Sequence, residues 1–308
     1  MTSAKKNTLW AELGLMLATI FWGSAFAVMK TATESMAPAC IIAIRYGIGA
    51  LPLLAVFSKR LKKWDRPCLF GGLLLGALNF AGMELQTVGL QYTTAGKNAF
   101  LTSAYCVAVP FLYWIVRRKK PEAVNLISAL LCVVGIGLLS LQGSLTVGFG
   151  DLLSLLCGLA FAAQIVAVSI LTEKHDPILL LVWQTVFTMV FALPFAFHAG
   201  FPATLSAASA GALLYLGIFC TMAASAAQII GQKYTTPAQA SLTMSLESVF
   251  GTLSGIIFLK ESVTPQLSAG FALIFTAVLL SVLPPVPRRK TARHKKAPEP
   301  CAEHGHGR

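Results

Sequence analysis

The 308-residue sequence contains few charged residues, only 12% of its positions, whereas 56% are hydrophobic and the mean hydropathy is +0.72. This composition lies far outside that of an ordinary water-soluble domain. A spanning helix needs about 20 mostly apolar residues, and a chain of this length holds about ten of them if the connections are short. We therefore expect an integral membrane protein.

The sequence also lacks the motifs of common catalytic and metal centres. It contains no HExxH helix, no GxSxG turn and no Gly-rich phosphate loop, and its seven cysteines are scattered without CxxC spacing. The stretch GFGD, which ends at Asp151, matches the GxGD pattern of intramembrane aspartyl proteases, but the other aspartates, Asp65 and Asp176, fall in expected loops. We predict a protein that is not an enzyme, without catalytic residues, a metal site or a cofactor.

Apolar segments of spanning length recur along the chain. A β-barrel would need segments of about ten residues that alternate apolar and polar positions, and these segments are apolar on every side. We predict an all-α integral membrane protein with ten transmembrane helices, the first of which is a retained span and not a signal peptide. The expected spans are 10–29, 38–57, 68–90, 95–116, 123–141, 150–171, 177–198, 207–230, 237–259 and 265–283.

Basic residues indicate the orientation. With the amino terminus in the cytoplasm, 20 of the 24 lysines and arginines fall in cytoplasmic loops and tails, as the positive-inside rule expects. The net charge of +12 is therefore explained by topology, with some attraction to anionic membrane lipid, and not by nucleic-acid binding. We expect a multi-pass protein of the cell membrane with a cytoplasmic terminus at 1–9 and a basic, disordered cytoplasmic tail at 284–308.

One sequence motif at a junction between two expected spans occurs twice. The stretch GLQYTTAGKNAF, from Gly89 to Phe100, returns 142 positions later as GQKYTTPAQASL, from Gly231 to Leu242, without Lys97. With five spans to a repeat, the second copy must enter the membrane the other way up. We therefore predict two inverted five-helix repeats at 10–141 and 150–283, joined by an external linker at 142–149, around a central cavity.

Longer motifs carry a family resemblance. FWGSAFAVMK, IRYGIGALPLL, GLQYTTAGKNAFLTSAY and LESVFGTLSGIIFLKESVTPQLSAG occur in this order, and over residues 10–284 the chain resembles the EamA-type transporters of the drug/metabolite transporter superfamily. The resemblance implies ten helices in two inverted repeats and alternating-access transport of a small-molecule substrate, often the export of amino acids or related compounds. The sixth expected span lacks the pair Trp22 and Gly23, so the pocket need not be symmetric. The alternative is a non-transporting membrane sensor or scaffold, and either would be a monomer or a homodimer.

Polar residues inside the spans are the candidates for a substrate pathway. A charge near the bilayer centre costs about 2.5 to 3.5 kcal/mol on insertion scales, so such residues should face a cavity or a partner. Each has a structural alternative: a salt bridge, a snorkelling lysine, a protonated glutamate between helices, or aromatic packing. The candidates are Trp22, Arg45, Glu84, Lys97, Tyr105, Gln164, Gln184 and Glu247.

Depth along the spans suggests more specific roles. Glu247 lies roughly 15 Å into its span, near the midplane, where it could bind a proton or a substrate amine. A carboxylate there is compatible with proton coupling and with uncoupled flow alike. Arg45 and Glu84 lie roughly 10 Å and 9 Å below the outer surface on consecutive helices, so we expect them to form an ion pair, with Lys97 competing for Glu84.

Overall fold

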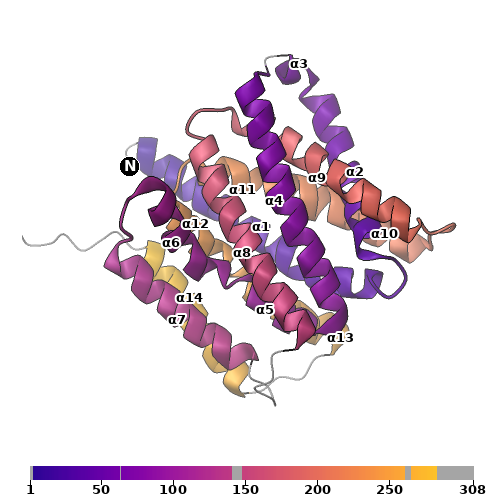
Figure 1. Ribbon diagram of the computed structural model, residues 1–308. Coiled ribbons are helices and arrows are strands. Elements are labelled where there is room, and N and C mark those ends of the chain that lie inside the picture. Colours follow the sequence, from indigo (N-terminus) through magenta and orange to yellow (C-terminus); the bar gives the residue numbers. More distant parts are fainter. Residues whose placement is uncertain (1–2, 63, 141–147, 261–264, 283–308) are drawn as a thin grey trace, which may run out of the picture.

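The computed structural model describes residues 3–62, 64–140, 148–260 and 265–282 (Figure 1). Every regular element in these ranges is a helix, so the all-helical prediction is confirmed for the described residues. The expected tail at 284–308 and most of the expected linker, 142–147, lie outside the described residues.

The helices follow one another in two runs of similar length. The first run contains α1 (Ser3–Ala32), α2 (Pro38–Val56), α3 (Ser58–Leu61), α4 (Arg66–Tyr92), α5 (Ala95–Thr102), α6 (Tyr105–Arg117) and α7 (Ala123–Ser140). The second contains α8 (Phe149–Leu171), α9 (Pro177–Ala199), α10 (Ala207–Tyr215), the π-helix η1 (Leu216–Ala223), α11 (Ala224–Gln232), α12 (Pro237–Met244), α13 (Glu247–Leu259) and α14 (Pro265–Val282).

Eight segments of the described chain are long and apolar enough to cross a membrane. They are Thr8–Ala32, Pro38–Val56, Arg66–Tyr92, Ala95–Arg117, Phe149–Leu171, Pro177–Ala199, Ala207–Gln232 and Pro237–Leu259. Helices α7 and α14 stand where the fifth and tenth spans are expected, and they pack against each other (Figure 1). The chain is therefore a multi-pass membrane protein.

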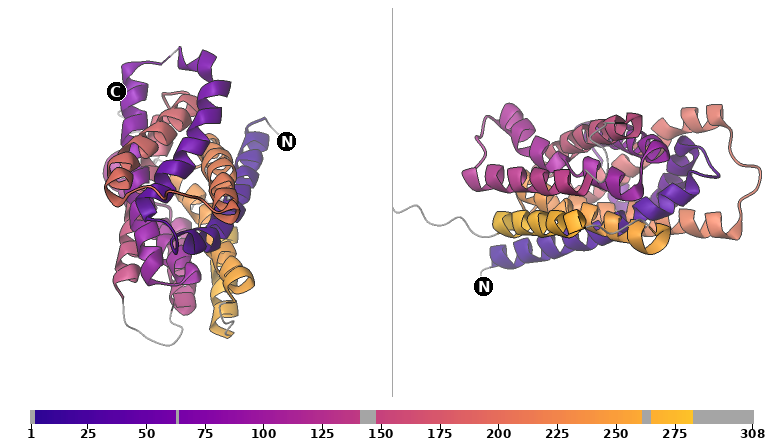
Figure 2. Two further views of the ribbon diagram at one scale, coloured as in Figure 1. Left: turned by 90° about the vertical axis from the view of Figure 1, so that its right-hand side faces the viewer. Right: turned by 90° about the horizontal axis from the view of Figure 1, so that it is seen from below.

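The outer surface of the bundle is apolar, as a lipid-facing surface must be. Leu51, Val56, Phe197 and Ile257 are among the large hydrophobic side chains that are about two-thirds or more exposed. In water such a surface would drive association, whereas in a bilayer its neighbours are acyl chains. Figures 1 and 2 show that the short helix α3, between α2 and α4, projects at one end of the bundle.

Several helices begin at side chains that cap their first turn. The Asp65 carboxylate accepts a hydrogen bond from the Cys68 backbone N–H at 2.8 Å, and Asp176 accepts one from Ile178 N–H at 2.8 Å. Thr94 caps α5 and Thr236 caps α12 in the same way. Each cap satisfies a donor that the helix leaves unpaired, so these positions set where the helices start.

The fourth and ninth expected spans are each broken into two helices, which the apolar patterns did not predict. The breaks fall between α5 and α6, at Ser103, and between α12 and α13, at Ser245, which is 142 positions later. Each serine hydroxyl bonds back to a carbonyl of the preceding turn, Ser103 to Ala99 O at 2.9 Å and Ser245 to Leu242 O at 2.7 Å. Such bonds offer the backbone an alternative to a continuous helix.

Small residues allow close helix packing at the centre of the bundle. A Cβ atom on Gly72 of α4 would lie 2.2 Å from the Trp183 Cβ, and one on Gly76 would lie 2.5 Å from the Phe187 Cβ. Both neighbours belong to α9, so α4 and α9 approach each other more closely than larger residues would permit. Helix α4 also packs along α8, and α2 along α9. These contacts bring α2, α4 and α8 around one interior space.

Candidate functional site

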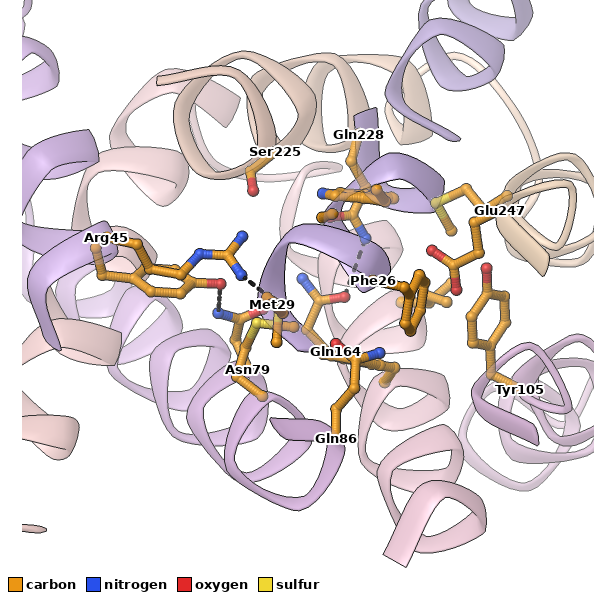
Figure 3. Close-up of a pocket in the computed structure, with 17 residues that line it drawn as sticks. Phe26, Met29, Arg45, Asn79, Gln86, Tyr105, Gln164, Ser225, Gln228 and Glu247 are labelled. Atoms are coloured by element: carbon orange, nitrogen blue, oxygen red, sulfur yellow. Dashed lines mark hydrogen bonds between the residues drawn. The ribbon is translucent and has the colours of Figure 1, made fainter. Parts of the chain in front are cut away.

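A cavity of about 60 Å³ lies inside the bundle (Figure 3). This volume has room for roughly four to six water molecules. The cavity combines aromatic and sulfur-containing walls with several uncharged polar groups and two charged residues. Its lining includes Trp22, Phe26, Met29, Arg45, Tyr46, Asn79, Gln86, Tyr105, Gln164, Ser225, Gln228, Met244 and Glu247.

Arg45 of α2 occupies one end of the cavity and is only 2% exposed. Its Nε donates to Thr221 Oγ1 at 2.9 Å, and its Nη1 lies 3.1 Å from Met29 Sδ. Among the described residues, Arg45 forms no ion pair with a carboxylate. A buried guanidinium with only neutral partners retains the capacity to bind an anion, because its charge has not been neutralised.

Amide side chains fill the middle of the cavity. Gln228 Nε2 donates to Gln164 Oε1 at 3.1 Å, and Gln164 Nε2 donates to Gln184 Oε1 at 3.0 Å. Asn79 Nδ2 donates to Tyr46 Oη at 2.7 Å. These amides hold one another in place and present both donors and acceptors to the cavity.

Glu247 lies at the end of the cavity opposite Arg45 (Figure 3). It is the first residue of α13, and Tyr105 is the first residue of α6. The Tyr105 hydroxyl points toward the Glu247 carboxylate (Figure 3). The helix breaks thus place an acid and a phenol together in the protein interior, although they are 142 positions apart in the sequence.

Most of the predicted pathway residues meet at this cavity. Trp22, Arg45, Tyr105, Gln164 and Glu247 line it directly. Trp22 is also fixed by its Nε1, which donates to the Cys220 carbonyl at 2.8 Å. Gln184 does not line the cavity but supports it, because it accepts the hydrogen bond from Gln164.

The predicted ion pair between Arg45 and Glu84 is wrong. Arg45 turns toward Met29 and Thr221, whereas Glu84 does not line the cavity, and its buried Oε2 has no hydrogen-bond partner among the described residues. Depth along two helices places residues at one level but says nothing about which way each side chain faces. Equal depth was therefore insufficient to predict contact.

The expected competition of Lys97 for Glu84 is also wrong. Its Nζ lies 2.6 Å from Asp151 Oδ2 and forms an ion pair with that residue, not with Glu84. Asp151 Oδ1 accepts a hydrogen bond from Thr93 Oγ1 at 3.1 Å, and Asp151 Oδ2 also accepts one from the Gly148 N–H. Nothing in the sequence spacing of Asp151 connects it to Lys97, so this ion pair was not predicted.

Two kinds of polar residue were not predicted from the sequence as site residues. Asn79, Gln86 and Ser225 line the cavity, yet single neutral residues in an apolar segment carry a weak signal. Glu12 is buried in α1, where its two oxygens accept hydrogen bonds from Thr235 and Thr243. The sequence feature that could have identified Glu12 is its position inside the first apolar segment, two residues after the expected start at residue 10.

A separate group of potential metal ligands lies away from the cavity. Donor atoms of Asp65, Cys68 and His175 come within 4.8 Å of one another, and His175 Nδ1 is 3.9 Å from Asp65 Oδ1. The sequence predicted no metal site, and the Asp65 carboxylate already caps α4 through Cys68 N–H. We assign this group a structural role in joining the start of α4 to the segment before α9.

The fold and the cavity define a helical membrane protein with a small cavity inside its bundle. The model of the EamA-like transporter family matches the chain twice, at residues 9–141 and 148–283. The chain belongs to this family.

Named relatives agree with this assignment. A protein of Archaeoglobus fulgidus named an uncharacterized transporter is 35% identical over 272 residues, which are 88% of this chain and 85% of that protein. The uncharacterized transporter YwfM of Bacillus subtilis is 28% identical over 91% of this chain and 96% of its own length. A solved structure described as a crystal structure of protein has a TM-score of 0.72 with 17% identity and covers 88% of this chain and 96% of its own, which supports the fold alone.

Proposed function

We propose that this chain is a secondary transporter of the cell membrane that exports amino acids or closely related small metabolites by alternating access. The observation that carries the proposal is one cavity with Arg45 at one end and Glu247 at the other. Amino acids and related metabolites carry both a carboxylate and an ammonium group. Arg45 offers a charge complementary to the first, and Glu247 offers one complementary to the second.

Arg45 supplies the anion-binding end. A guanidinium can donate two parallel hydrogen bonds to a carboxylate, and such charge-assisted pairs are stronger than neutral hydrogen bonds. Thr221 orients the Nε side of the guanidinium, and no carboxylate of the described chain competes for the group. A substrate carboxylate would therefore neutralise a charge that the protein leaves uncompensated.

Glu247 supplies the cation-binding end. Its carboxylate can accept hydrogen bonds from an ammonium group, and the Tyr105 hydroxyl lies next to it (Figure 3). A proton can occupy the same carboxylate. Competition between the proton and the substrate amine at Glu247 would couple export to proton entry, and we include this coupling in the proposal.

The arrangement of the two halves supports alternating access. The two family matches divide the chain near its middle, and the helix breaks at Ser103 and Ser245 occupy equivalent positions in the two halves. We propose ten spans in two inverted repeats, with α7 and α14 as the fifth and tenth and both termini in the cytoplasm. Mirrored halves of this kind allow one central site to open to either side in turn.

The test is binding and transport of a matched set of small molecules. Purified protein is screened by thermal shift against amino acids, the corresponding amines that lack the carboxylate, and the corresponding acids that lack the amine. A ligand that binds only the folded state raises the apparent stability. Active compounds are then assayed for flux in proteoliposomes. We expect amino acids to give the largest shifts and to be transported.

Variants assign the two ends of the site. Arg45→Gln should reduce binding of carboxylate-bearing compounds, and Glu247→Gln should reduce binding of amine-bearing compounds. Glu84→Gln and Arg60→Gln are matched controls, because neither residue lines the cavity. Equal binding of all three compound classes by the unmodified protein would contradict the proposal. A chain that carried no solute while retaining a partner protein would instead be a membrane sensor or scaffold.

A further inference from the structure

Two buried carboxylates stand at equivalent positions of the two halves. Glu12 is the tenth residue of α1, and Asp151, 139 positions later, is the third residue of α8. The same offset relates Pro38, the first residue of α2, to Pro177, the first residue of α9. Glu12 is 8% exposed and Asp151 is 4% exposed.

Asp151 joins α8 to the junction between α4 and α5. Its Oδ1 accepts a hydrogen bond from Thr93 at 3.1 Å, and its Oδ2 lies 2.6 Å from Lys97 Nζ. Thr93 stands in the junction itself, and Lys97 stands on the first turn of α5. We name this set of contacts, made by Thr93, Lys97 and Asp151, the outer clamp.

Glu12 makes the corresponding contacts at the other junction. Its Oε1 accepts a hydrogen bond from Thr235 at 2.9 Å, and its Oε2 accepts one from Thr243 at 2.7 Å. Thr235 follows Thr93 by 142 positions and stands between α11 and α12, while Thr243 lies on α12. We name this set, made by Glu12, Thr235 and Thr243, the inner clamp.

The backbones beside the two clamps are also packed alike. A Cβ atom on Gly89 of α4 would lie 3.0 Å from the carbonyl oxygen of Gly150 on α8. A Cβ atom on Gly231 of α11 would lie 3.2 Å from the carbonyl oxygen of Ala11 on α1. Gly89 and Gly231 are 142 positions apart, and Ala11 and Gly150 are 139 apart. The correspondence is therefore not limited to one pair of polar side chains.

The clamps differ in charge. The position that corresponds to Lys97 in the second half is Gln239, which is neutral. Among the side chains that the structure describes, no basic group forms an ion pair with Glu12. A second lysine adds to the outer side, because Lys30 Nζ donates to the Leu90 carbonyl at 2.7 Å and to the Thr93 carbonyl at 3.0 Å.

Other ion pairs on the inner-clamp side do not offset the difference in charge between the two clamps. Arg60 pairs with Asp176, and Arg117 pairs with Glu173, at the ends of helices on the inner-clamp side. The carboxylate side chains of these pairs are 38% and 49% exposed, whereas that of Asp151 is 5% exposed. Exposed pairs contribute little, since water and salt screen them, and a buried pair is costly to separate.

We propose that Asp151 and Glu12 are positioning residues of the outer and inner gates, and that Lys97 makes the empty carrier rest with its cavity open to the cytoplasm. The inference rests on the alternating-access part of the proposed function. Opening the outer gate separates an ion pair whose carboxylate is 5% exposed and whose lysine is 28% exposed. Opening the inner gate breaks only hydrogen bonds from hydroxyl groups to a carboxylate that water can then solvate. A resting state that faces the cytoplasm loads substrate there, as export requires.

Labelling of one cysteine in the cavity measures which gate is open. Ser225→Cys places a thiol in the cavity lining. Cys301→Ser removes the native cysteine that lies outside the described residues, and the other six cysteines are buried. A membrane-impermeant maleimide is applied to intact cells, and separately to inside-out vesicles, without added substrate. We expect faster labelling from the cytoplasmic side than from outside.

Moving the lysine from the outer clamp to the inner clamp should reverse the side to which the empty carrier is open. Lys97→Gln should increase labelling from outside by at least about threefold relative to labelling from inside. Gln239→Lys should act in the same direction by strengthening the inner clamp. Thr235 Oγ1 lies 2.9 Å from Glu12 Oε1 and 3.4 Å from Gln239 Oε1. A lysine at position 239 therefore reaches the Glu12 carboxylate. The double exchange should make labelling from outside the faster of the two.

Controls separate the charge from the side-chain volume. Lys97→Arg keeps the cation and should label as the parent protein does. Gln239→Lys leaves the outer pair intact, so it remains informative if Lys97→Gln fails to accumulate in the membrane. Ratios of outside to inside labelling that stay unchanged in Gln239→Lys and in Lys97→Gln would overturn the inference. If the labelling ratio shifts as expected in these variants but the protein transports no amino acid, the gating role of the clamps is supported and the proposed substrate is rejected.

Discussion

Tyr105 and Glu247 face each other inside the bundle because each is the first residue after the break in its own half of the chain (Figure 3). They are 142 positions apart, so one half supplies a phenol where the other supplies an acid. The pair therefore places the only carboxylate of the cavity lining, among the described residues, next to a hydroxyl group that can stabilise its charge.

Replacing Glu247 tests the acid in this pair. Glu247→Gln keeps the size of the side chain and removes its charge, so binding of amine-bearing substrates should weaken by about tenfold or more, as expected for loss of a hydrogen bond to a charged group. The pH dependence of transport should also flatten. Isothermal titration and proteoliposome flux at several pH values measure both effects. Unchanged flux and an unchanged pH profile would leave Glu247 with a packing role alone.

Replacing Arg45 tests the other end of the cavity. Arg45→Gln should weaken binding of carboxylate-bearing compounds, and Arg45→Lys should restore only part of the affinity, because an ammonium group lacks the planar fork of donors. Thermal shift with amino acids and with their decarboxylated amines distinguishes the two classes. If Arg45→Lys bound amino acids as tightly as the parent protein, recognition through two parallel hydrogen bonds would be wrong.

A double-mutant cycle tests the ion pair between Lys97 and Asp151. Lys97→Gln and Asp151→Asn should each lower stability in detergent, since each leaves a largely buried charge without its partner. The double variant should lose less than the sum of the two, with a coupling energy between about 0.5 and 3 kcal/mol. Lys120→Gln, in the exposed segment after α6, is the matched surface control. Strictly additive losses would contradict the pair.

Close packing at Gly23 predicts a large effect from a small change. A Cβ atom at this position would lie 2.3 Å from the Phe250 Cβ and 2.8 Å from the Gly251 backbone nitrogen. Gly23→Ala should therefore destabilise the protein by about 1 to 3 kcal/mol, because α1 and α13 would have to move apart. Gly211→Ala on α10 is the control, since nothing lies within 4 Å of its Cβ position. Similar unfolding temperatures for the two variants would refute this account.

The two junction tyrosines test the proposed topology. Tyr92 is 64% exposed and Tyr234 is 45% exposed, and each stands at a junction between two helices, so the two positions report on the two junctions. In a Cys301→Ser background, an impermeant thiol reagent outside intact cells should label Tyr92→Cys and spare Tyr234→Cys. Labelling of both from one side would show that the two junctions share a membrane face, and the inverted arrangement would then be rejected.

The sequence predicted much of the cavity but not its internal contacts. Trp22, Arg45, Tyr105, Gln164 and Glu247 were identified because polar and aromatic groups inside apolar segments must face something other than lipid. That reasoning depends only on the cost of burial and works one residue at a time. It missed Asn79, Gln86 and Ser225, whose neutral groups cost less to bury and so do not stand out from the pattern.

Which polar side chains contact one another could not be predicted without the tertiary structure. Arg45 and Glu84 were expected to meet because they lie at one depth, but Arg45 bonds to Thr221, and Lys97 bonds to Asp151. A helix rotates by about 100° per residue, so a contact depends on the direction of each side chain as well as on its height. That direction is set by how the helices pack.

The sequence by itself determined that the chain is helical and membrane-embedded, because the length and composition of each apolar segment decide whether it is stable in lipid. It also determined the repeat, since the junction motifs at Gly89 and Gly231 can be read without coordinates. Only the tertiary structure decided that Ser103 and Ser245 interrupt their spans and that Glu12 and Asp151 each meet a junction threonine. These features depend on close approach between segments distant in the chain, which local composition does not specify.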